Sequence, residues 1–189
     1  MRVSREQVVE NRRKIVSAAG RLFRERGVEA VSIAEVMQAA GLTHGGFYGY
    51  FDSKDDLVAA AIAGALASAP PPGDLAAYLA TYLSPAHRDD RARGCAMAAL
   101  AAETVRAPDA ARAEMTAGLR RQIDTLARLA PGVDAAERRR AAIGGWAAMV
   151  GALILARVSD DEALSVEVLD ETRAWLETRR EQDARALPA

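Results

Sequence analysis

Apolar residues recur every three or four positions along most of the chain, and the short segments between these stretches contain Gly, Pro or charged residues. The first stretch ends at Gly27 and has its apolar positions at Ile15, Ala19, Leu22 and Phe23. This spacing is typical of amphipathic helices, which Gly and Pro commonly terminate. The pattern predicts about nine helices, over residues 5–26, 33–40, 44–50, 54–69, 74–83, 94–106, 109–129, 134–157 and 165–183.

The composition favours the same fold class. Ala accounts for 43 of the 189 residues and has the highest helix propensity, whereas the strand-favouring Trp, Tyr and Phe together number only nine. We therefore expect an all-α protein rather than a sandwich, a barrel or a parallel sheet.

The second and third helices are predicted to be short. Ser32 and Glu35 have the spacing of a capping box, Gly41 ends that helix after two turns, and Thr43 is placed to cap the next one. Two short helices joined by a Gly-containing turn, behind a longer first helix, form a helix-turn-helix. In this motif the second short helix enters the DNA major groove, which is about 12 Å wide.

Residues 33–57, IAEVMQAAGLTHGGFYGYFDSKDDL, resemble the DNA-binding segment of the TetR/AcrR family of bacterial transcriptional regulators. The matching features are Ala39-x-Gly41-Leu42-Thr43, Phe47-Tyr48-x-Tyr50-Phe51 and Ser53-Lys54-x-x-Leu57. The resemblance implies a three-helix DNA-binding domain over residues 1–54 and a larger helical effector-binding and dimerisation domain over 55–189. It further implies a cytoplasmic homodimer on a palindromic operator, most often a repressor, released when a small-molecule effector shifts the helix after residue 54.

The distribution of charge agrees with a nucleic-acid partner at one end of the chain. Residues 1–54 hold nine basic and six acidic side chains, and the remainder holds 16 and 20. Only the N-terminal part is therefore expected to meet a polyanion.

Eight residues are candidates for DNA contact: Ser32, Thr43, His44, Gly45, Gly46, Tyr48, Tyr50 and Lys54. The tyrosine hydroxyls can donate to phosphate, and Lys54 combines an ammonium with a helix N-terminus, as does a matching lysine in the family. Gly is unfavourable in a helix, so two in succession indicate that something approaches the backbone closely, either DNA or a neighbouring helix.

Each of the other candidates also has a structural interpretation. Thr43 and Ser32 can serve as helix caps alone, His44 can be a solvated surface residue, and Tyr50 can belong to the core. Phe47 and Phe51 are expected in the core. With few side chains able to read bases, part of the specificity is expected to come from DNA shape.

The helix predicted over 134–157 is apolar on nearly every face, so a single subunit is not expected to cover it. Its uncharged run of 16 residues is shorter than the ~20 needed to span a bilayer. With the last helix it is expected to form a dimer interface containing Ile143, Val150, Ile154, Leu169, Trp175 and Leu176. The large side chains available to line an effector pocket are Tyr78, Tyr82, Cys95, Trp146 and Met149.

Cys95 has two interpretations. It is either a small buried apolar residue or a sensor, activated by nearby arginines, in a redox- or electrophile-responsive regulator. The stretch HRDDRARGCAMAAL resembles a segment found in a subset of these regulators, some of which sense electrophiles or oxidants through cysteine.

The sequence holds few residues suited to catalysis or metal binding. One Cys and two His exclude a disulfide framework and a multi-thiolate zinc site. The sequence shows no paired acid and base, phosphate loop or metal cluster, and its N-terminus lacks the apolar core of a signal peptide. We therefore expect no cofactor, no metal, no membrane partner and no enzymatic activity.

Overall fold

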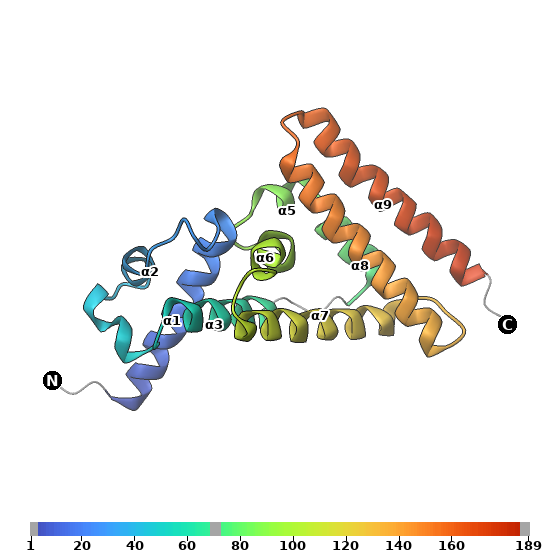
Figure 1. Ribbon diagram of the computed structural model, residues 1–189. Coiled ribbons are helices and arrows are strands. Elements are labelled where there is room, and N and C mark those ends of the chain that lie inside the picture. Colours follow the sequence, from blue (N-terminus) through green and yellow to red (C-terminus); the bar gives the residue numbers. More distant parts are fainter. Residues whose placement is uncertain (1–3, 69–72, 186–189) are drawn as a thin grey trace. The chain divides into compact units, whose positions relative to one another are not determined.

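The computed structural model describes residues 4–68 and 73–185, and these ranges contain helices and no strand (Figure 1). The all-α prediction is confirmed. The helices are α1 (Arg5–Arg26), α2 (Ile33–Ala39), the 3₁₀ helix η1 (His44–Gly49), α3 (Lys54–Ala67), α4 (Leu75–Tyr82), α5 (Pro85–Asp89), α6 (Ala96–Thr104), α7 (Asp109–Leu129), α8 (Ala135–Val158) and α9 (Glu162–Arg185).

Most of these helices begin where a short polar side chain accepts a backbone N–H of the first turn. The residues in this role are Ser4, Ser32, Ser53, Asp74, Ser84 and Asp134. The sequence prediction missed α5 because it treated Pro85 as a break. Pro85 instead occupies the first turn of α5 behind the Ser84 cap, a position where its missing N–H costs nothing.

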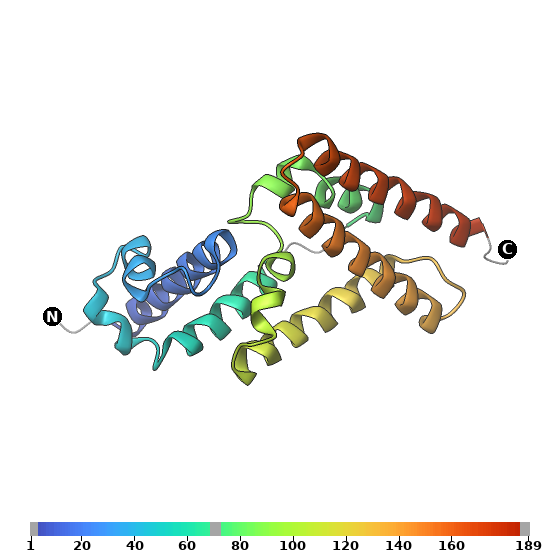
Figure 2. The same ribbon diagram turned by 45° about the horizontal axis from the view of Figure 1, so that its top comes forward.

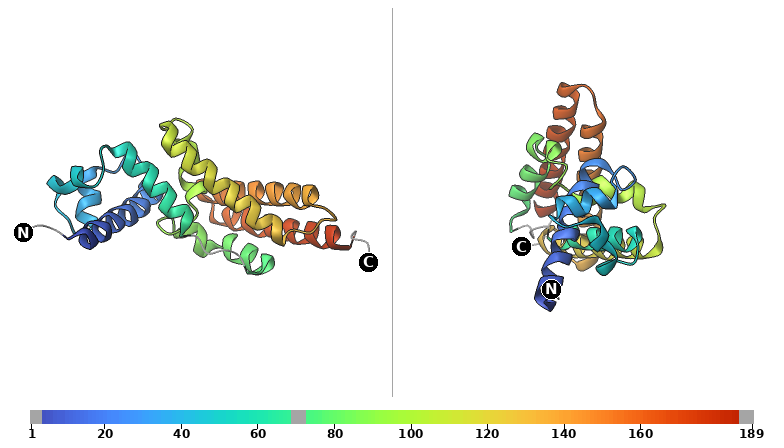
Figure 3. Two further views of the ribbon diagram at one scale, coloured as in Figure 1. Left: turned by 90° about the horizontal axis from the view of Figure 1, so that it is seen from below. Right: turned by 90° about the vertical axis from the view of Figure 1, so that its left-hand side faces the viewer.

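The chain divides into two compact units. The first contains residues up to 69 together with 91–118. In this unit α3 and α6 both pack against α1, and Figures 1 and 3 show α1 beside α3. Ile15, Phe23, Met37, Phe47 and Leu57 are among the fully buried side chains of its core.

The second unit contains residues 70–90 together with 119 onward. Here α8 and α9 form an antiparallel hairpin, seen side by side in Figures 2 and 3, and α4 and α5 pack against it. The predicted boundary at residue 54 stays a prediction. The compact units divide differently because α3 and α6 pack with α1, and the first half of α7 belongs to the same unit as these helices.

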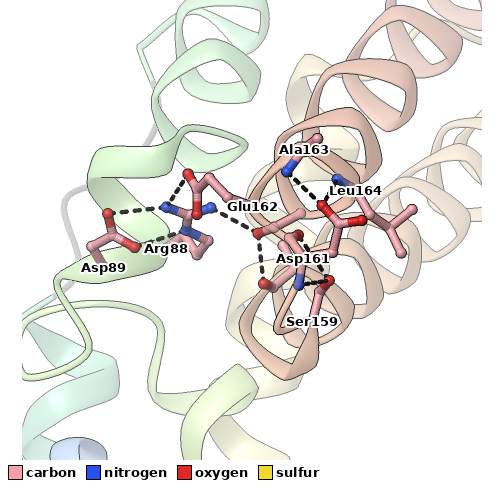
Figure 4. Close-up of polar contacts among 9 residues, drawn as sticks. Arg88, Asp89, Ser159, Asp161, Glu162, Ala163 and Leu164 are labelled. Atoms are coloured by element: carbon pink, nitrogen blue, oxygen red, sulfur yellow. Dashed lines mark hydrogen bonds and ion pairs between the residues drawn. The ribbon is translucent and has the colours of Figure 1, made fainter.

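An arginine cluster joins α5 to the start of α9 (Figure 4). Arg88, only 9% exposed, donates to Asp89 at 2.7 Å, to Glu162 at 3.0 Å and to the Ser165 hydroxyl at 2.7 Å. The hydrogen bonds that Arg88 donates to Asp89 and then to Glu162 raise the pKa of its guanidinium. Arg157 of α8 donates to the Arg88 carbonyl at 3.0 Å. The Arg88 guanidinium is therefore already used by contacts within the second unit.

Candidate nucleic-acid interface

The capping box predicted at the start of α2 is confirmed. The Ser32 hydroxyl accepts the Glu35 N–H, and the Glu35 carboxylate accepts both the backbone N–H and the hydroxyl of Ser32. Arg26 also pairs with Glu35, at 2.9 Å. The bonds from Ser32 and then from Arg26 lower the pKa of Glu35 from 4.5 to about 2. The Ser32 side chain therefore caps α2 within the protein, whether or not it also contacts DNA.

The turn between α2 and η1 depends on Gly41. Its φ is +72°, in the left-handed region that L side chains rarely adopt, and nothing lies within 4 Å of a Cβ built there. The requirement for Gly is thus conformational, set by the turn between α2 and η1.

The segment after this turn is a 3₁₀ helix rather than the α-helix that the sequence suggested. Thr43 occupies its N-cap position but makes no side-chain capping bond, so the capping role predicted for Thr43 is wrong. Two consecutive glycines weaken an α-helix, which accounts for the short 3₁₀ form. Thr43, His44, Gly45 and Tyr48 are exposed, and Phe47 is fully buried as predicted.

The two adjacent glycines of η1 are not required by the packing of the protein itself. A Cβ on Gly45 would meet nothing within 4 Å, and one on Gly46 would lie at 3.8 Å from the Thr43 hydroxyl oxygen, an ordinary contact. The neighbouring-helix explanation for these glycines is therefore wrong. Gly45 faces open space, where an external surface can approach its backbone, and Gly46 beside it is half-buried.

The two tyrosines of this segment differ in their surroundings. Tyr48 is 71% exposed, and its ring packs edge-on against Phe47 at 5.2 Å. Tyr50 is half-buried, and its hydroxyl oxygen accepts a 2.8 Å hydrogen bond from Asn11 of α1. Asn11 in turn accepts from Gln7 at 2.8 Å. Tyr50 is thus partly a core residue, and its own hydroxyl hydrogen is left to donate elsewhere.

Sequence analysis missed Asn11 and Arg12. Asn11 lies four positions before Ile15 on the buried face of α1, so a polar residue in an apolar stripe was the available signal. The Arg12 guanidinium lies 4.7 Å from the centre of the buried Phe51 ring, in a cation–π contact. Lys54 is the first residue of α3, behind the Ser53 cap, and is half-buried.

A cavity of about 600 Å³ lies within the second unit, lined by residues of α4, α7, α8 and α9. Of the predicted pocket residues, Trp146 and Met149 line it. Tyr78, Tyr82 and Cys95 do not line it. Tyr82 packs edge-on against Trp146 at 5.3 Å, behind the wall, and Tyr78 accepts a hydrogen bond from Gln122 at 3.0 Å. Cys95 belongs to the first unit, where its sulfur caps α6 by accepting the Ala98 N–H.

The predicted dimer residues fall into three groups. Ile143, Ile154 and Trp175 are exposed at 45%, 38% and 57%, and Val150 is half-buried. Leu176 lines the cavity. Leu169 is 0% exposed within a single subunit, so its placement in an interface is wrong. It lies on the buried face of α9, which the periodicity of the sequence does not distinguish from an interface between subunits.

Within the described ranges, α8 is a helix long and apolar enough to cross a membrane, and 33% of its most apolar stretch is buried. As expected, a single subunit leaves much of it uncovered. An apolar helix half-covered by its own chain is also typical of an interface between subunits.

A long first helix, a short capped helix, a glycine turn and a second short helix with an exposed backbone define a helix-turn-helix protein of the DNA-binding class. Residues 15–61 match the model of the bacterial regulatory proteins of the tetR family. Over these residues the chain is similar to the DNA-binding segment of that family of transcriptional regulators.

Individual known proteins are similar to the chain either in this segment or in the whole fold. The chain is 38% identical over 60 residues to the HTH-type transcriptional regulator TtgR of Pseudomonas putida, a match that covers 32% of this chain and 29% of TtgR. A TetR regulator from Chloroflexus aurantiacus is 26% identical with a TM-score of 0.73, covering 94% of this chain and 97% of that one. The reduced form of E. coli NemR has the same fold, with 20% identity, a TM-score of 0.67 and coverage of 89% and 95%.

Proposed function

We propose that the protein is a homodimeric transcriptional repressor that binds a palindromic operator in the cytoplasm and leaves it when a small molecule occupies the cavity of the second unit. The observation that carries the DNA-binding part is the open surface at Gly45. This glycine is unfavourable where it lies, and no neighbour within the protein requires it. Close approach of a DNA backbone or groove edge would explain why this position is glycine.

The surrounding groups have the chemistry of a DNA-facing surface. Thr43, His44 and Tyr48 are exposed beside the glycines, and the Tyr50 hydroxyl has a hydrogen left to donate. Lys54 adds a cation at the first turn of α3, where the helix N-terminus also favours an anion. We assign phosphate contacts to Tyr48, Tyr50 and Lys54, and close backbone approach to Gly45 and Gly46.

The test is a Gly45→Ala variant assayed on labelled DNA from upstream of the protein's own gene. In the free protein the new Cβ meets nothing, so stability stays the same or rises by about 0.5–1 kcal/mol. On DNA the methyl group occupies the space between backbone and groove, and we expect the affinity to fall roughly tenfold or more. Fluorescence anisotropy measures the affinity, and urea unfolding measures the stability.

Gly73→Ala provides the matched control. Gly73 also has open space around a built Cβ but lies outside the DNA-binding segment, so its variant should bind DNA like the wild type. Equal DNA affinity for wild type and Gly45→Ala would contradict the assignment. A wild-type affinity that barely changes with salt would contradict DNA binding by this surface altogether.

The dimer is proposed to form through the exposed apolar face of α8 and α9. Ile143, Ala147, Val150, Ile154 and Val158 follow one another at helical spacing on α8, and all are exposed or half-exposed. A second copy related by a two-fold axis would cover this stripe in a four-helix arrangement. The helix-turn-helix motifs of the two subunits would then face the two halves of a palindromic site.

A second candidate function is control through Cys95. The sulfur is half-buried rather than sealed, and it lies at the N-terminus of α6, where negative charge on sulfur is favoured. The reduced form of E. coli NemR has the same fold, and this likeness supports testing the redox state of Cys95. In the anisotropy assay a reversible thiol oxidant should release wild type but not Cys95→Ser. Equal behaviour of the two proteins would leave Cys95 as a structural cap.

A further inference from the structure

The cavity of the second unit has charged as well as apolar walls, and this combination restricts what it can bind. This inference rests on the proposed function, in which the cavity is the effector site. At about 600 Å³ the cavity suits a small organic molecule.

The apolar part of the wall is rigid. Leu79 of α4, Leu126 of α7, and Trp146 and Met149 of α8 line the cavity, and each of these side chains is no more than 6% exposed. Buried side chains of this kind hold their rotamers and offer a preformed surface for a hydrocarbon or an aromatic ring.

The charged part of the wall comes from the first turns of α8 and the last turns of α9. Because the two helices run antiparallel, as Figure 2 shows, Arg140 of α8 lies at the same end of the hairpin as Arg179 and Arg180 of α9. Glu137 and Asp183 also line the cavity, so the lining carries three cations and two anions.

The two acidic groups already have partners. Glu137 accepts the Val133 N–H at 3.0 Å, and Asp183 pairs with Arg179 at 3.4 Å. Arg180 differs, because its Nε is buried and has no hydrogen-bond acceptor among the described residues. A buried donor on a charged group without an acceptor is unfavourable, and such groups usually mark a place for a missing partner.

We propose that the cavity binds an apolar organic acid as a monoanion, with its carboxylate on the guanidinium of Arg180 and its hydrocarbon part against Trp146 and Met149. A carboxylate matches the planar donor geometry of guanidinium and supplies the acceptor that Nε lacks. A cation would be repelled by the excess positive charge of the lining. A dianion such as a phosphate ester would meet Glu137 and Asp183, whereas a monoanion brings the lining to neutrality.

The test compares an acid with its neutral counterpart of the same shape, 4-butylbenzoate and 4-butylbenzamide. Both tryptophans of the chain, Trp146 and Trp175, line the cavity, so tryptophan fluorescence of the full-length protein reports its occupancy directly. Isothermal titration calorimetry without DNA gives the dissociation constants. We expect the acid to bind roughly tenfold more tightly than the amide, because only the acid forms a charge-assisted hydrogen bond with the Arg180 guanidinium.

Three variants locate the effect. Arg180→Gln should lower the affinity for the acid about tenfold and leave the affinity for the amide within about twofold. Arg180→Lys should have an intermediate affinity for the acid, because it keeps the positive charge and loses the planar pair of donors of the guanidinium. Arg173→Gln is the control, since Arg173 lies on the same helix, pairs with Asp170 and does not line the cavity. Thermal melting establishes that each variant is folded.

The assignment is overturned if acid and amide bind equally, if neither binds, or if Arg180→Gln leaves the acid's affinity unchanged. Fluorescence anisotropy on operator DNA tests the ligand class of the cavity separately from the proposed control of DNA binding by an effector. Acid binding that depends on Arg180 but does not release DNA would uphold the ligand class and contradict effector control. Release by a neutral or cationic compound instead would uphold effector control and overturn the ligand class.

Discussion

Tyr50 shows how one side chain can belong to the protein core and to the surface that we propose contacts DNA. Its ring is half-buried, and its oxygen accepts a hydrogen bond from Asn11, a residue of α1 that is only 7% exposed. Because that oxygen is already an acceptor within the protein, the direction of its remaining O–H bond is restricted. Asn11 and Gln7 thereby orient a donor at the surface, through a polar chain inside the first unit.

Removing the two tyrosine hydroxyls should have different effects. Tyr48→Phe should leave stability within about 0.5 kcal/mol of wild type and weaken DNA binding roughly five- to tenfold, because the Tyr48 side chain is largely exposed. Tyr50→Phe should weaken DNA binding too and also lower stability by about 1–2 kcal/mol, since Asn11 loses its acceptor. Urea unfolding and anisotropy on operator DNA measure the two effects, and a destabilised Tyr48→Phe would contradict this assignment.

Glu35 should make stability depend on pH in the acidic range. Its pKa in the folded protein is about 2, against an ordinary value of 4.5, so between these values the unfolded state binds more protons. The stabilisation is fully present above pH 4.5 and is lost as pH falls toward about 2. Comparing urea midpoints of wild type and Glu35→Gln across this range should show a difference that shrinks as pH falls. A constant difference would mean that the Ser32 and Arg26 contacts do not hold in solution.

At the scale of elements, α6 fixes the turn between α1 and α2. The Glu103 carboxylate accepts the Val28 N–H at 2.8 Å, directly after Gly27, whose φ is +85°. In the segment before α6, the Ala92 carbonyl accepts a 2.9 Å hydrogen bond from Arg24 of α1. The helix-turn-helix is thereby attached to α6 and to the segment that precedes it, both within the first unit.

Glu103→Ala should lower stability by about 1–3 kcal/mol because the Val28 N–H loses its partner. Glu103→Gln keeps an acceptor oxygen and should lose less than the alanine variant. Urea unfolding gives the free energies, and hydrogen exchange should show faster opening of the amide of Val28 in Glu103→Ala. Unchanged protection of that amide would show that the Glu103 contact contributes nothing.

The sequence predicted the helices well wherever periodicity and caps agreed. The capping box at Ser32, the buried Phe47 and the end of α1 at Gly27 all depend on local chemistry, and all are confirmed. The short elements were less predictable. The form of η1 depends on how weakly two glycines support an α-helix, and α5 depends on whether Pro85 breaks or begins a helix.

At the scale of the whole molecule, the proposed dimer should depend on the exposed face of α8. Ile154→Arg places a charge in the middle of this face and should convert the dimer to a monomer in analytical ultracentrifugation. Operator affinity should fall tenfold or more, because two tethered heads bind far more tightly than one. Val105→Arg, at an exposed apolar residue outside α8 and α9, is the control and should remain dimeric. A dimeric Ile154→Arg protein would contradict this interface.

The sites of the second unit were only partly accessible to sequence analysis. Periodicity shows that α8 is apolar on several faces, but it does not show which face meets the same chain and which meets another molecule. Leu169 was placed in the interface for that reason and is core. Arg180 was missed because a charged residue on a helix is usually solvated, and only the packing of four helices around one cavity buries its Nε.

The lysine of the first turn of α3 has a practical consequence for labelling. The chain contains 25 Lys and Arg residues, but only Lys14 and Lys54 are lysines, on α1 and α3 of the same unit. An amine-selective reagent at mild pH, or a protease that cleaves after lysine, therefore acts on side chains of the first unit and not on those of the second. Footprinting with such a reagent would follow occupation of the operator in crude mixtures without any engineered tag.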